Sequence, residues 1–377
     1  MSDYYRVGII GFGHMHINHV AAVFGKHPRV RWVACADTVP AQPELREGPY
    51  TRSWNLQHAL REIGVPQAYA DYREMLAKER FDIIIICSEN AQHPEVVEAC
   101  AAAGVHVCVE KPMAASLAGA LRMVRACQAA GTTMVVNWPL TWQPGARKIK
   151  ELIDAGAIGR VLEIRWRGGH SGPLGPGASH AGVSETAMPL SGPERGATWW
   201  HQRAAGGGAM LDMCCYGAMA SRWYLGQQAI AAQGLQANLN STWGDADDHA
   251  VMAVRFPQAL GVFEGTWIAP GVDVLGPNVR GTTGTLVAES HDDQITVRLE
   301  RGHGQSEVCP APPMPAGRDN IAAELIHHLS TGEPVHHTLE MMLNLDAMAI
   351  LDAGLRSAAS GRLELVGGPT WEPGRVG

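Results

Sequence analysis

The sequence predicts an α/β chain in two parts: a doubly wound parallel sheet over residues 1–138, then an α+β domain with a large, mostly antiparallel sheet over 139–377. Three observations predict this. Apolar strand-like runs alternate with helix-like segments in the first part, and a glycine-rich turn follows the first run. Beyond residue 138 the apolar positions recur with a period of two. The 377 residues are enough for two domains, each with its own core.

In the first part, each expected element has a local signature. The run Ile83–Cys87 is apolar throughout, which is typical of a parallel strand covered on both faces. Gly104 and Gly131 follow two alanine-rich segments at the position where helices end. The expected strands are 7–10, 29–36, 83–87, 105–109 and 133–136, and the expected helices are 54–63, 71–78, 94–103 and 117–130.

The second part begins with an expected helix over 145–155, which Gly156 closes. Strands of period two follow, and two helices close the chain. The expected strands are 161–167, 231–238, 249–256, 260–267, 285–289 and 295–299, and the closing helices are 320–329 and 339–357. We expect helices on one face of this sheet and a partner subunit on the other, in a homodimer or homotetramer, because large apolar sheets seldom stay open to water.

A stretch dominated by Gly, Pro and Ser runs from Gly168 to Ala197. Loops of this length are usually functional or disordered, and we interpret this one as a loop over the active site. Trp199 and Trp200 follow it, and each indole either covers a bound ligand or packs in the core.

The composition excludes several classes of protein. The net charge of -7 is spread along the chain without a basic stripe, so we expect no nucleic-acid partner. The apolar runs are too short to cross a bilayer and no secretory signal is recognisable, so we expect no membrane contact and a cytoplasmic location. The eight cysteines lack the paired spacing of a metal site, and we expect no metal at His14, His16 and His19.

The residues nearest the N-terminus have the order of a dinucleotide site. Val7–Ile10 is an expected buried strand, Gly11 permits a tight turn, and Gly13 lets the backbone approach a pyrophosphate at the start of a helix. Asp37 ends the second strand, 24 positions after Gly13, close to where a Rossmann fold places the carboxylate that binds the adenosine ribose. That carboxylate would repel a 2′-phosphate, which favours NAD and leaves NADP as the alternative.

A second motif, Glu110-Lys111-Pro112, follows the strand 105–109 at its carboxyl end. Ligands of open α/β sheets bind outside the carboxyl ends of the strands, so Lys111 is expected to face the cofactor crevice. The alternative is a surface turn with an ion pair.

A third motif places Asp212 and Tyr216 after the glycine triplet 206–208. The two residues are i and i+4 on an expected helix, and hence share one face. A lysine beside a tyrosine lowers the tyrosine pKa towards the working range, and such a pair can exchange the proton that accompanies hydride transfer at a carbinol. The alternative is a core tyrosine with no role in chemistry.

Together these motifs resemble the Gfo/Idh/MocA family over nearly the whole chain, and Ser88-Glu89-Asn90 with His93 is similar to the family's loop after the fourth strand. The resemblance implies an NAD(P)-dependent oxidoreductase that acts on a sugar, a sugar derivative or a cyclitol. The cofactor-binding residues it implies are Gly11, Phe12, Gly13, His14, Met15, Asp37, Ser88, Asn90, His93, Glu110, Lys111 and Trp200.

The resemblance also implies catalytic roles: Lys111 would hold the substrate hydroxyl, Asp212 would orient the substrate, and Tyr216 would be the acid/base. Most members carry histidine at this last position, although tyrosine there is similar to glucose–fructose oxidoreductase. Cys214 and His16 replace glycines that are usual in the family, which bears on the identity of the substrate more than on the chemistry.

Two other functions stay open on the sequence. One is an enzyme that keeps its NAD bound and cleaves or rearranges a glycoside through transient oxidation, and the other is a non-catalytic sugar or dinucleotide sensor. The presence of Lys111, Asp212 and Tyr216 favours an enzyme. The sugar, the reacting carbon and the direction of the reaction are not fixed by these residues.

Overall fold

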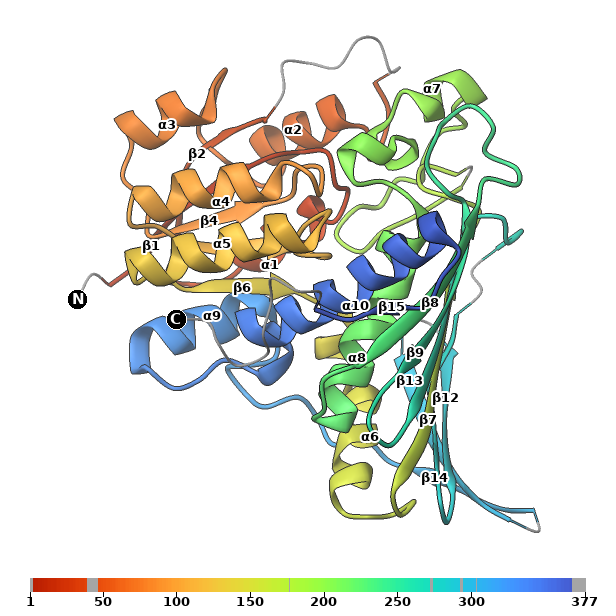
Figure 1. The fold of residues 1–377 in the computed structure, drawn as a ribbon. Helices are drawn as coiled ribbons and strands as arrows, with labels where there is room; N and C mark the ends of the chain where they lie inside the picture. The colour runs from red at the N-terminus through yellow and green to blue at the C-terminus, as the bar shows by residue number, and fades with distance from the viewer. Residues whose placement is uncertain are drawn as a thin grey trace.

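The computed structural model describes residues 3–38, 47–175, 177–271, 274–291, 294–302 and 304–367. Two β-sheets lie side by side, and helices flank each of them (Figure 1). One sheet is parallel with six strands, and the other has nine strands that are mostly antiparallel. The predicted fold class, an α/β half followed by an α+β half, is therefore confirmed.

The first sheet alternates with helices along the chain. Its strands are β1 (Tyr5–Ile10), β2 (Val30–Ala36), β3 (Ala68–Tyr69), β4 (Ile83–Ile86), β5 (His106–Glu110) and β6 (Met134–Asn137). Its helices are α1 (Ile17–Gly25), α2 (Arg52–Arg61), α3 (Tyr72–Lys78), α4 (His93–Ala102) and α5 (Leu117–Ala130). The strand order is β3-β2-β1-β4-β5-β6, so the winding reverses between β1 and β4, and ligands of such sheets bind in the crevice at this point.

The second sheet contains β7 (Val161–Gly169), β8 (Ala231–Ala237), β9 (His249–Arg255), β10 (Leu260–Thr266), β11 (Leu275–Gly281), β12 (Thr285–His291), β13 (Gln294–Arg301), β14 (Gln305–Cys309) and β15 (Glu364–Leu365). The helices of this half are α6 (Pro144–Asp154), α7 (Gly192–Gly196), α8 (Cys215–Leu225), α9 (Ile321–Thr331) and α10 (Met341–Ser360). Short helical turns are η1 (Pro139–Trp142), η2 (Trp199–His201), η3 (Arg203–Ala205), η4 (Met210–Cys214) and η5 (His337–Leu339). The strand order is β14-β13-β12-β11-β7-β10-β9-β8-β15, and helices α6, α8 and α10 pack against one face (Figure 1).

The pattern of period two does not reveal β11 and β14. In β11, Gly276 and Pro277 interrupt the apolar pattern, and the pairing with β7 shifts between Leu275 and Asn278. β14 lies at the edge of the sheet and is mostly exposed, so its sequence carries no apolar alternation.

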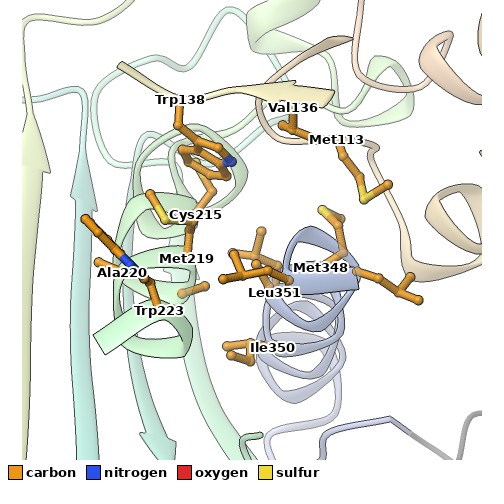
Figure 2. Close-up of a cluster of buried hydrophobic side chains, with 14 of the residues drawn as sticks. Met113, Val136, Trp138, Cys215, Met219, Ala220, Trp223, Met348, Ile350 and Leu351 are labelled. Atoms are coloured by element: carbon orange, nitrogen blue, oxygen red, sulfur yellow. The ribbon is translucent and has the colours of Figure 1, made fainter. Parts of the chain in front are cut away.

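The two halves share one apolar core. Met113 and Val136 of the first half pack in the same cluster as Met219 of α8 and Met348 and Leu351 of α10 (Figure 2). Fully buried side chains of this kind contribute roughly 1.5–3 kcal/mol each to folding. Packing therefore fixes the position of one half against the other.

Helix α9 comes late in the chain but lies against α1 of the first half. Its apolar residues Ile321, Leu325 and Ile326 belong to the cluster that covers the second face of the parallel sheet. None of the described helices combines the length and the apolar character needed to cross a bilayer. The cytoplasmic location stays a prediction.

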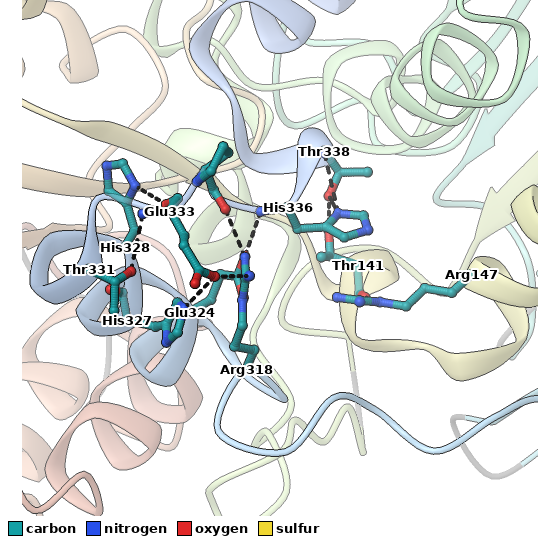
Figure 3. Close-up of polar contacts among 11 residues, drawn as sticks. Thr141, Arg147, Arg318, Glu324, His327, His328, Thr331, Glu333, His336 and Thr338 are labelled. Atoms are coloured by element: carbon teal, nitrogen blue, oxygen red, sulfur yellow. Dashed lines mark hydrogen bonds and ion pairs between the residues drawn. The ribbon is translucent and has the colours of Figure 1, made fainter.

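Arg318 anchors the start of α9 (Figure 3). Its Nε lies 2.8 Å from Oε2 and its Nη2 2.6 Å from Oε1 of Glu324, which is almost fully buried. Burial alone raises the pKa of Glu324, but Arg318 and the backbone N–H of His336 outweigh burial and lower it. The carboxylate is therefore ionised at neutral pH and depends on these donors.

An Arg318→Ala variant should lose about 2–3 kcal/mol of folding free energy, because it leaves a buried carboxylate short of its cation. Urea denaturation measures this loss. The exposed Arg61→Ala serves as the control and should change stability by less than about 0.5 kcal/mol. An Arg318→Ala protein as stable as the control would show that the ion pair contributes nothing.

Candidate active site

The turn after β1 requires glycine. Gly11 has a φ of +90°, in the left-handed region, and a Cβ there would lie 2.6 Å from the backbone nitrogen of Ser88. At Gly13 a Cβ would lie 2.8 Å from Nη2 of Arg52. The backbone thus runs close to its neighbours, and α1 begins a few residues later. A tight glycine turn before a helix N-terminus fits the pyrophosphate of a dinucleotide.

Side chains from a distant segment also reach this turn. Trp199 Nε1 donates to the carbonyl oxygen of Gly13 at 2.8 Å, and its indole stacks on that of Trp200 with ring centroids 3.9 Å apart. The rings of Trp200 and His14 are in a T-shaped arrangement with their centroids 4.6 Å apart. Met15 packs in the same apolar cluster as both tryptophans. The loop that ends in these tryptophans therefore contacts the dinucleotide turn directly.

Asp37 follows β2 and accepts hydrogen bonds from the backbone N–H of Phe12 at 3.3 Å and of Thr38 at 2.8 Å. The Phe12 side chain points into the core, so only its backbone faces the site. The guanidinium of Arg52 pairs with Asp37 and also with Glu89. Arg52 carries no sequence signal that connects it to this site. It places a cation beside the carboxylate that was expected to repel a 2′-phosphate.

Hydrogen bonds from the side chains of His93 and Asn90 hold the loop after β4 in place. The two ring nitrogens of His93 lie 3.2 Å from the carbonyl oxygens of Met113 and Ser88. Burial lowers the pKa of His93 to about 4, so the ring is neutral and donates to one carbonyl at a time. Asn90 Nδ2 donates to the carbonyl of Gly206 at 2.8 Å, while within the described chain its buried Oδ1 has no partner.

Lys111 and Asp212 meet at the centre of the site, although one comes from each half of the chain. Nζ of Lys111, which is 2% exposed, donates to Oδ1 of Asp212 at 2.7 Å and to its backbone oxygen at 3.0 Å. Trp267 Nε1 donates to Oδ2 at 3.1 Å. Burial opposes both charges, but the pairing outweighs it, raising the pKa of Lys111 and lowering that of Asp212. The pair is ionised at neutral pH.

Tyr216 departs from the expectation in two respects. A π-helical turn, η4, precedes α8 and contains Asp212, so the two residues do not share the regular helix that the sequence predicts; such turns are frequent at functional sites. The ring stacks on Trp166 with centroids 5.2 Å apart, and Lys111 Nζ lies 4.8 Å from its centroid.

The predicted lowering of the tyrosine pKa is wrong. Burial raises the pKa of Tyr216, and Lys111 offsets only part of this rise.

A cavity of about 350 Å³ lies at this junction, a size typical of small-molecule sites. The predicted residues that line it are His14, Met15, Lys111, Trp200, Asp212 and Tyr216. The other predicted residues are not among those that line it, and they follow β1, β2 and β4 or lie at the end of β5. His170 and His180 of the loop after β7 also line the cavity, and burial lowers the pKa of both, that of His180 to about 3. Both rings are therefore neutral at neutral pH.

His16 and Glu110 form a further pair beside the cavity. Nδ1 of His16 lies 2.9 Å from Oε1 of Glu110, whose Oε2 accepts from Asn137 Nδ2 at 3.1 Å. His16 lines the cavity, whereas Glu110 is buried behind it. The ligating atoms of His14, His16 and Glu110 lie within 4.8 Å of one another. No pattern in the sequence connects His16 with Glu110, which is 94 positions away.

Comparisons with known proteins agree with this architecture. The model of an oxidoreductase family with an NAD-binding Rossmann fold matches residues 5–138, and the GFO/IDH/MocA C-terminal domain matches residues 146–287.

The individual relatives described next have low sequence identity to this chain. The myo-inositol 2-dehydrogenase of Thermotoga maritima is 27% identical over 306 residues, which is 76% of this chain and 79% of that protein. The D-xylose 1-dehydrogenase (NADP+) of Haloarcula marismortui is 27% identical over 206 residues, and the match spans 54% of this chain and about half, 51%, of that relative. A structure of levoglucosan dehydrogenase in complex with NADH shares the fold with a TM-score of 0.74 at 21% identity, covering 96% of this chain and 99% of that one.

Proposed function

Since this chain belongs to the Gfo/Idh/MocA family of oxidoreductases with an NAD-binding Rossmann fold, we propose that it transfers hydride between nicotinamide and a carbinol carbon of a sugar, sugar derivative or cyclitol. The observation that carries this proposal is the Lys111–Asp212 pair in the cavity wall. An ammonium has three N–H donors. Among the described residues, Lys111 Nζ donates only to Oδ1 and to the backbone oxygen of Asp212. The third donor is directed to a substrate oxygen, which it polarises.

The other residues of the site have distinct tasks in this proposal. Gly11, Gly13 and Asp37 hold the dinucleotide, and the nicotinamide supplies or accepts the hydride when it is bound. Asp212 fixes the Lys111 ammonium and orients the substrate. Tyr216 exchanges the hydroxyl proton, and because burial keeps its hydroxyl protonated at neutral pH, it is suited to give a proton during reduction.

The test is reduction of NAD or NADP by the purified protein with D-xylose, myo-inositol and levoglucosan, followed by absorbance of the reduced nicotinamide. A Tyr216→Phe variant, which keeps the ring stacked on Trp166, should lower kcat by about 10²–10⁴-fold. Tyr224→Phe is the matched control, since Tyr224 is a buried tyrosine of the same helix that donates to the backbone oxygen of Ala146. Undiminished turnover in Tyr216→Phe would exclude the proposed proton exchange.

Arg52 should affect the choice of cofactor. An Arg52→Gln variant leaves Asp37 without its cation, so repulsion of a 2′-phosphate increases. The ratio of kcat/KM for NAD to that for NADP is expected to rise by about tenfold or more, which equals about 1.4 kcal/mol of discrimination. Arg61→Ala, at the other end of the same helix, is the control. A ratio that does not change would show that Arg52 is only structural.

One observation favours the second function, an enzyme that retains its NAD. Trp199 is hydrogen-bonded to the Gly13 carbonyl and Arg52 pairs with Asp37, so both side chains cover the dinucleotide turn and would slow cofactor exchange. Stoichiometric NAD released by denaturing dialysed protein, without steady reduction of added NAD, would support this function. Dialysed protein that contains no NAD would support exchange of the cofactor in each cycle.

We also propose that the outer face of the nine-stranded sheet is a homo-oligomer interface. Leu235, Leu260 and Leu275 are 68%, 55% and 54% exposed, and the register places them on the face opposite the helices together with Val251. Leu235 and Val251 lie opposite each other on β8 and β9, and adjoining exposed apolar side chains of this kind are typical of association sites. Light scattering on the purified protein should give a dimer or tetramer mass, and a monomer at micromolar concentration would contradict the proposal.

A further inference from the structure

The cavity contains a proton acceptor that oxidation of a carbinol by Lys111 and Tyr216 does not use. His16 Nδ1 faces the Glu110 carboxylate at 2.9 Å, and Asn137 holds the other carboxylate oxygen at 3.1 Å. Burial raises the pKa of Glu110, but His16, Lys111 and Asn137 outweigh burial and lower it. An ionised carboxylate keeps the proton of a neutral His16 on Nδ1. The Nε2 of this cavity-lining ring is then a lone-pair acceptor.

The neighbouring His14 has the opposite polarity. Its Nδ1 accepts the backbone N–H of His16 at 3.2 Å, which places the proton of the neutral ring on Nε2. This buried Nε2 has no partner within the part of the chain that the structure describes. The two rings, with centroids 4.3 Å apart, therefore present one donor and one acceptor from the same loop.

The same three residues could be read as a metal site, because their ligating atoms cluster within 4.8 Å. Coordination through His14 Nε2 would require its proton to move to Nδ1, where it would face the N–H of His16. The hydrogen bonds therefore favour an oxygen-bearing organic ligand over a cation.

The place of His16 in the site indicates where on the substrate it would act. This is the carbon next to the one that carries the oxygen held by Lys111. Glu110, which holds His16, and Lys111, which is directed to the substrate oxygen, are consecutive residues at the end of β5. A carbonyl oxygen at Lys111 acidifies the C–H bonds on the adjacent carbons. His16 and Lys111 line the same cavity, so an acceptor on His16 is suited to such a C–H bond.

We propose that His16, held by Glu110 and Asn137, removes the proton from the carbon adjacent to the carbonyl of a keto sugar, so that the site enolises this class of compound. The C–H bond breaks, the proton moves to Nε2, and the electron pair passes through the new C=C bond to the oxygen held by Lys111. Return of the proton restores the ketone, and no oxidant or reductant is consumed. The inference rests on the proposed function in that keto sugars are the products of that oxidation.

Exchange of hydrogen for deuterium tests this without any cofactor turnover. The full chain is incubated in D2O with 1,5-anhydro-D-fructose, and loss of the proton signals adjacent to the carbonyl is followed by NMR. The wild-type protein should accelerate the exchange at least about 100-fold over buffer. His16→Asn, which keeps a donor for Glu110, should lose at least about 100-fold of that rate, and Glu110→Gln should lose about tenfold or more.

Controls separate this role from a structural one. His337→Asn removes an exposed imidazole that pairs with Glu340 at 2.7 Å and should leave the exchange rate unchanged. His16→Gln is the second variant if His16→Asn fails to fold or to bind NADH. Wild-type exchange rates in the folded His16 variants, or exchange that EDTA abolishes and Zn²⁺ restores, would overturn the proposal.

The two proposals fail in distinguishable ways. A wild-type protein that reduces NAD with a sugar but exchanges no deuterium overturns this inference alone. A protein that exchanges deuterium through His16 but reduces no NAD supports this inference and contradicts the proposed function.

Discussion

A Lys111→Met variant should lose at least about 10³-fold in kcat/KM for any sugar that the wild-type protein oxidises, because it removes the donor that polarises the substrate oxygen. Methionine approximates the lysine stem but leaves Asp212 buried without a counter-charge. We therefore expect folding free energy to fall by about 3–5 kcal/mol as well. Steady-state kinetics and urea denaturation measure the two effects separately.

A double variant distinguishes lost chemistry from lost stability. Adding Asp212→Leu to Lys111→Met removes the uncompensated carboxylate, so much of the stability should return while activity stays absent. Lys78→Met removes an exposed lysine paired with Glu74 and should change neither quantity appreciably. Recovery of activity in the double variant would contradict the role assigned to Lys111.

A Gly11→Ala variant should lose at least about 100-fold in affinity for NADH. Alanine at a φ of +90° is strained, and its Cβ would lie 2.6 Å from the Ser88 backbone, so the turn must move away from β4. A displacement of about 1 Å at a binding element can cost about 10²-fold in function. Fluorescence titration with NADH measures the affinity, and thermal unfolding shows how much of the fold remains.

Gly104→Ala is the matched control for this experiment. Gly104 has a φ of +72°, but a Cβ there would meet nothing within 4 Å. This variant should therefore incur a backbone penalty of about 1–2 kcal/mol without any loss of NADH affinity. Equal losses of affinity in both variants would mean that general destabilisation, and not the close approach to Ser88, is responsible.

The elements predicted best are those with strong local signals. The helix Leu117–Ala130 has the predicted bounds, since Ser116 caps its first turn and Gly131 ends it in the left-handed conformation. The apolar run from Ile83 likewise forms the buried strand β4. β11 is missed because Gly276 and Pro277 hide a strand that exists only through pairing with its neighbours.

The features of the candidate site also fall into two groups, those that the sequence predicts and those that only tertiary contacts reveal. The glycine turn and the end of β5 follow from local pattern, and the family resemblance assigns Lys111 and Asp212 to one site without predicting the ion pair between them. The contacts of Arg52 with Asp37, of Trp267 with Asp212 and of His16 with Glu110 join residues far apart in sequence. A single sequence carries no signal for such contacts. The direction of the Tyr216 pKa shift also depends on burial, which is decided by tertiary packing.

The return of α9 to the first half has a mechanical consequence. Many two-domain enzymes close by a hinge, with one lobe rotating over the ligand. Here α9 belongs to the second half yet packs on α1, and a buried ion pair joins Lys111 to Asp212 across the seam. Rotation about that seam would break both contacts. We therefore expect the two halves to keep their relative position when ligands bind, so that the site is preorganised.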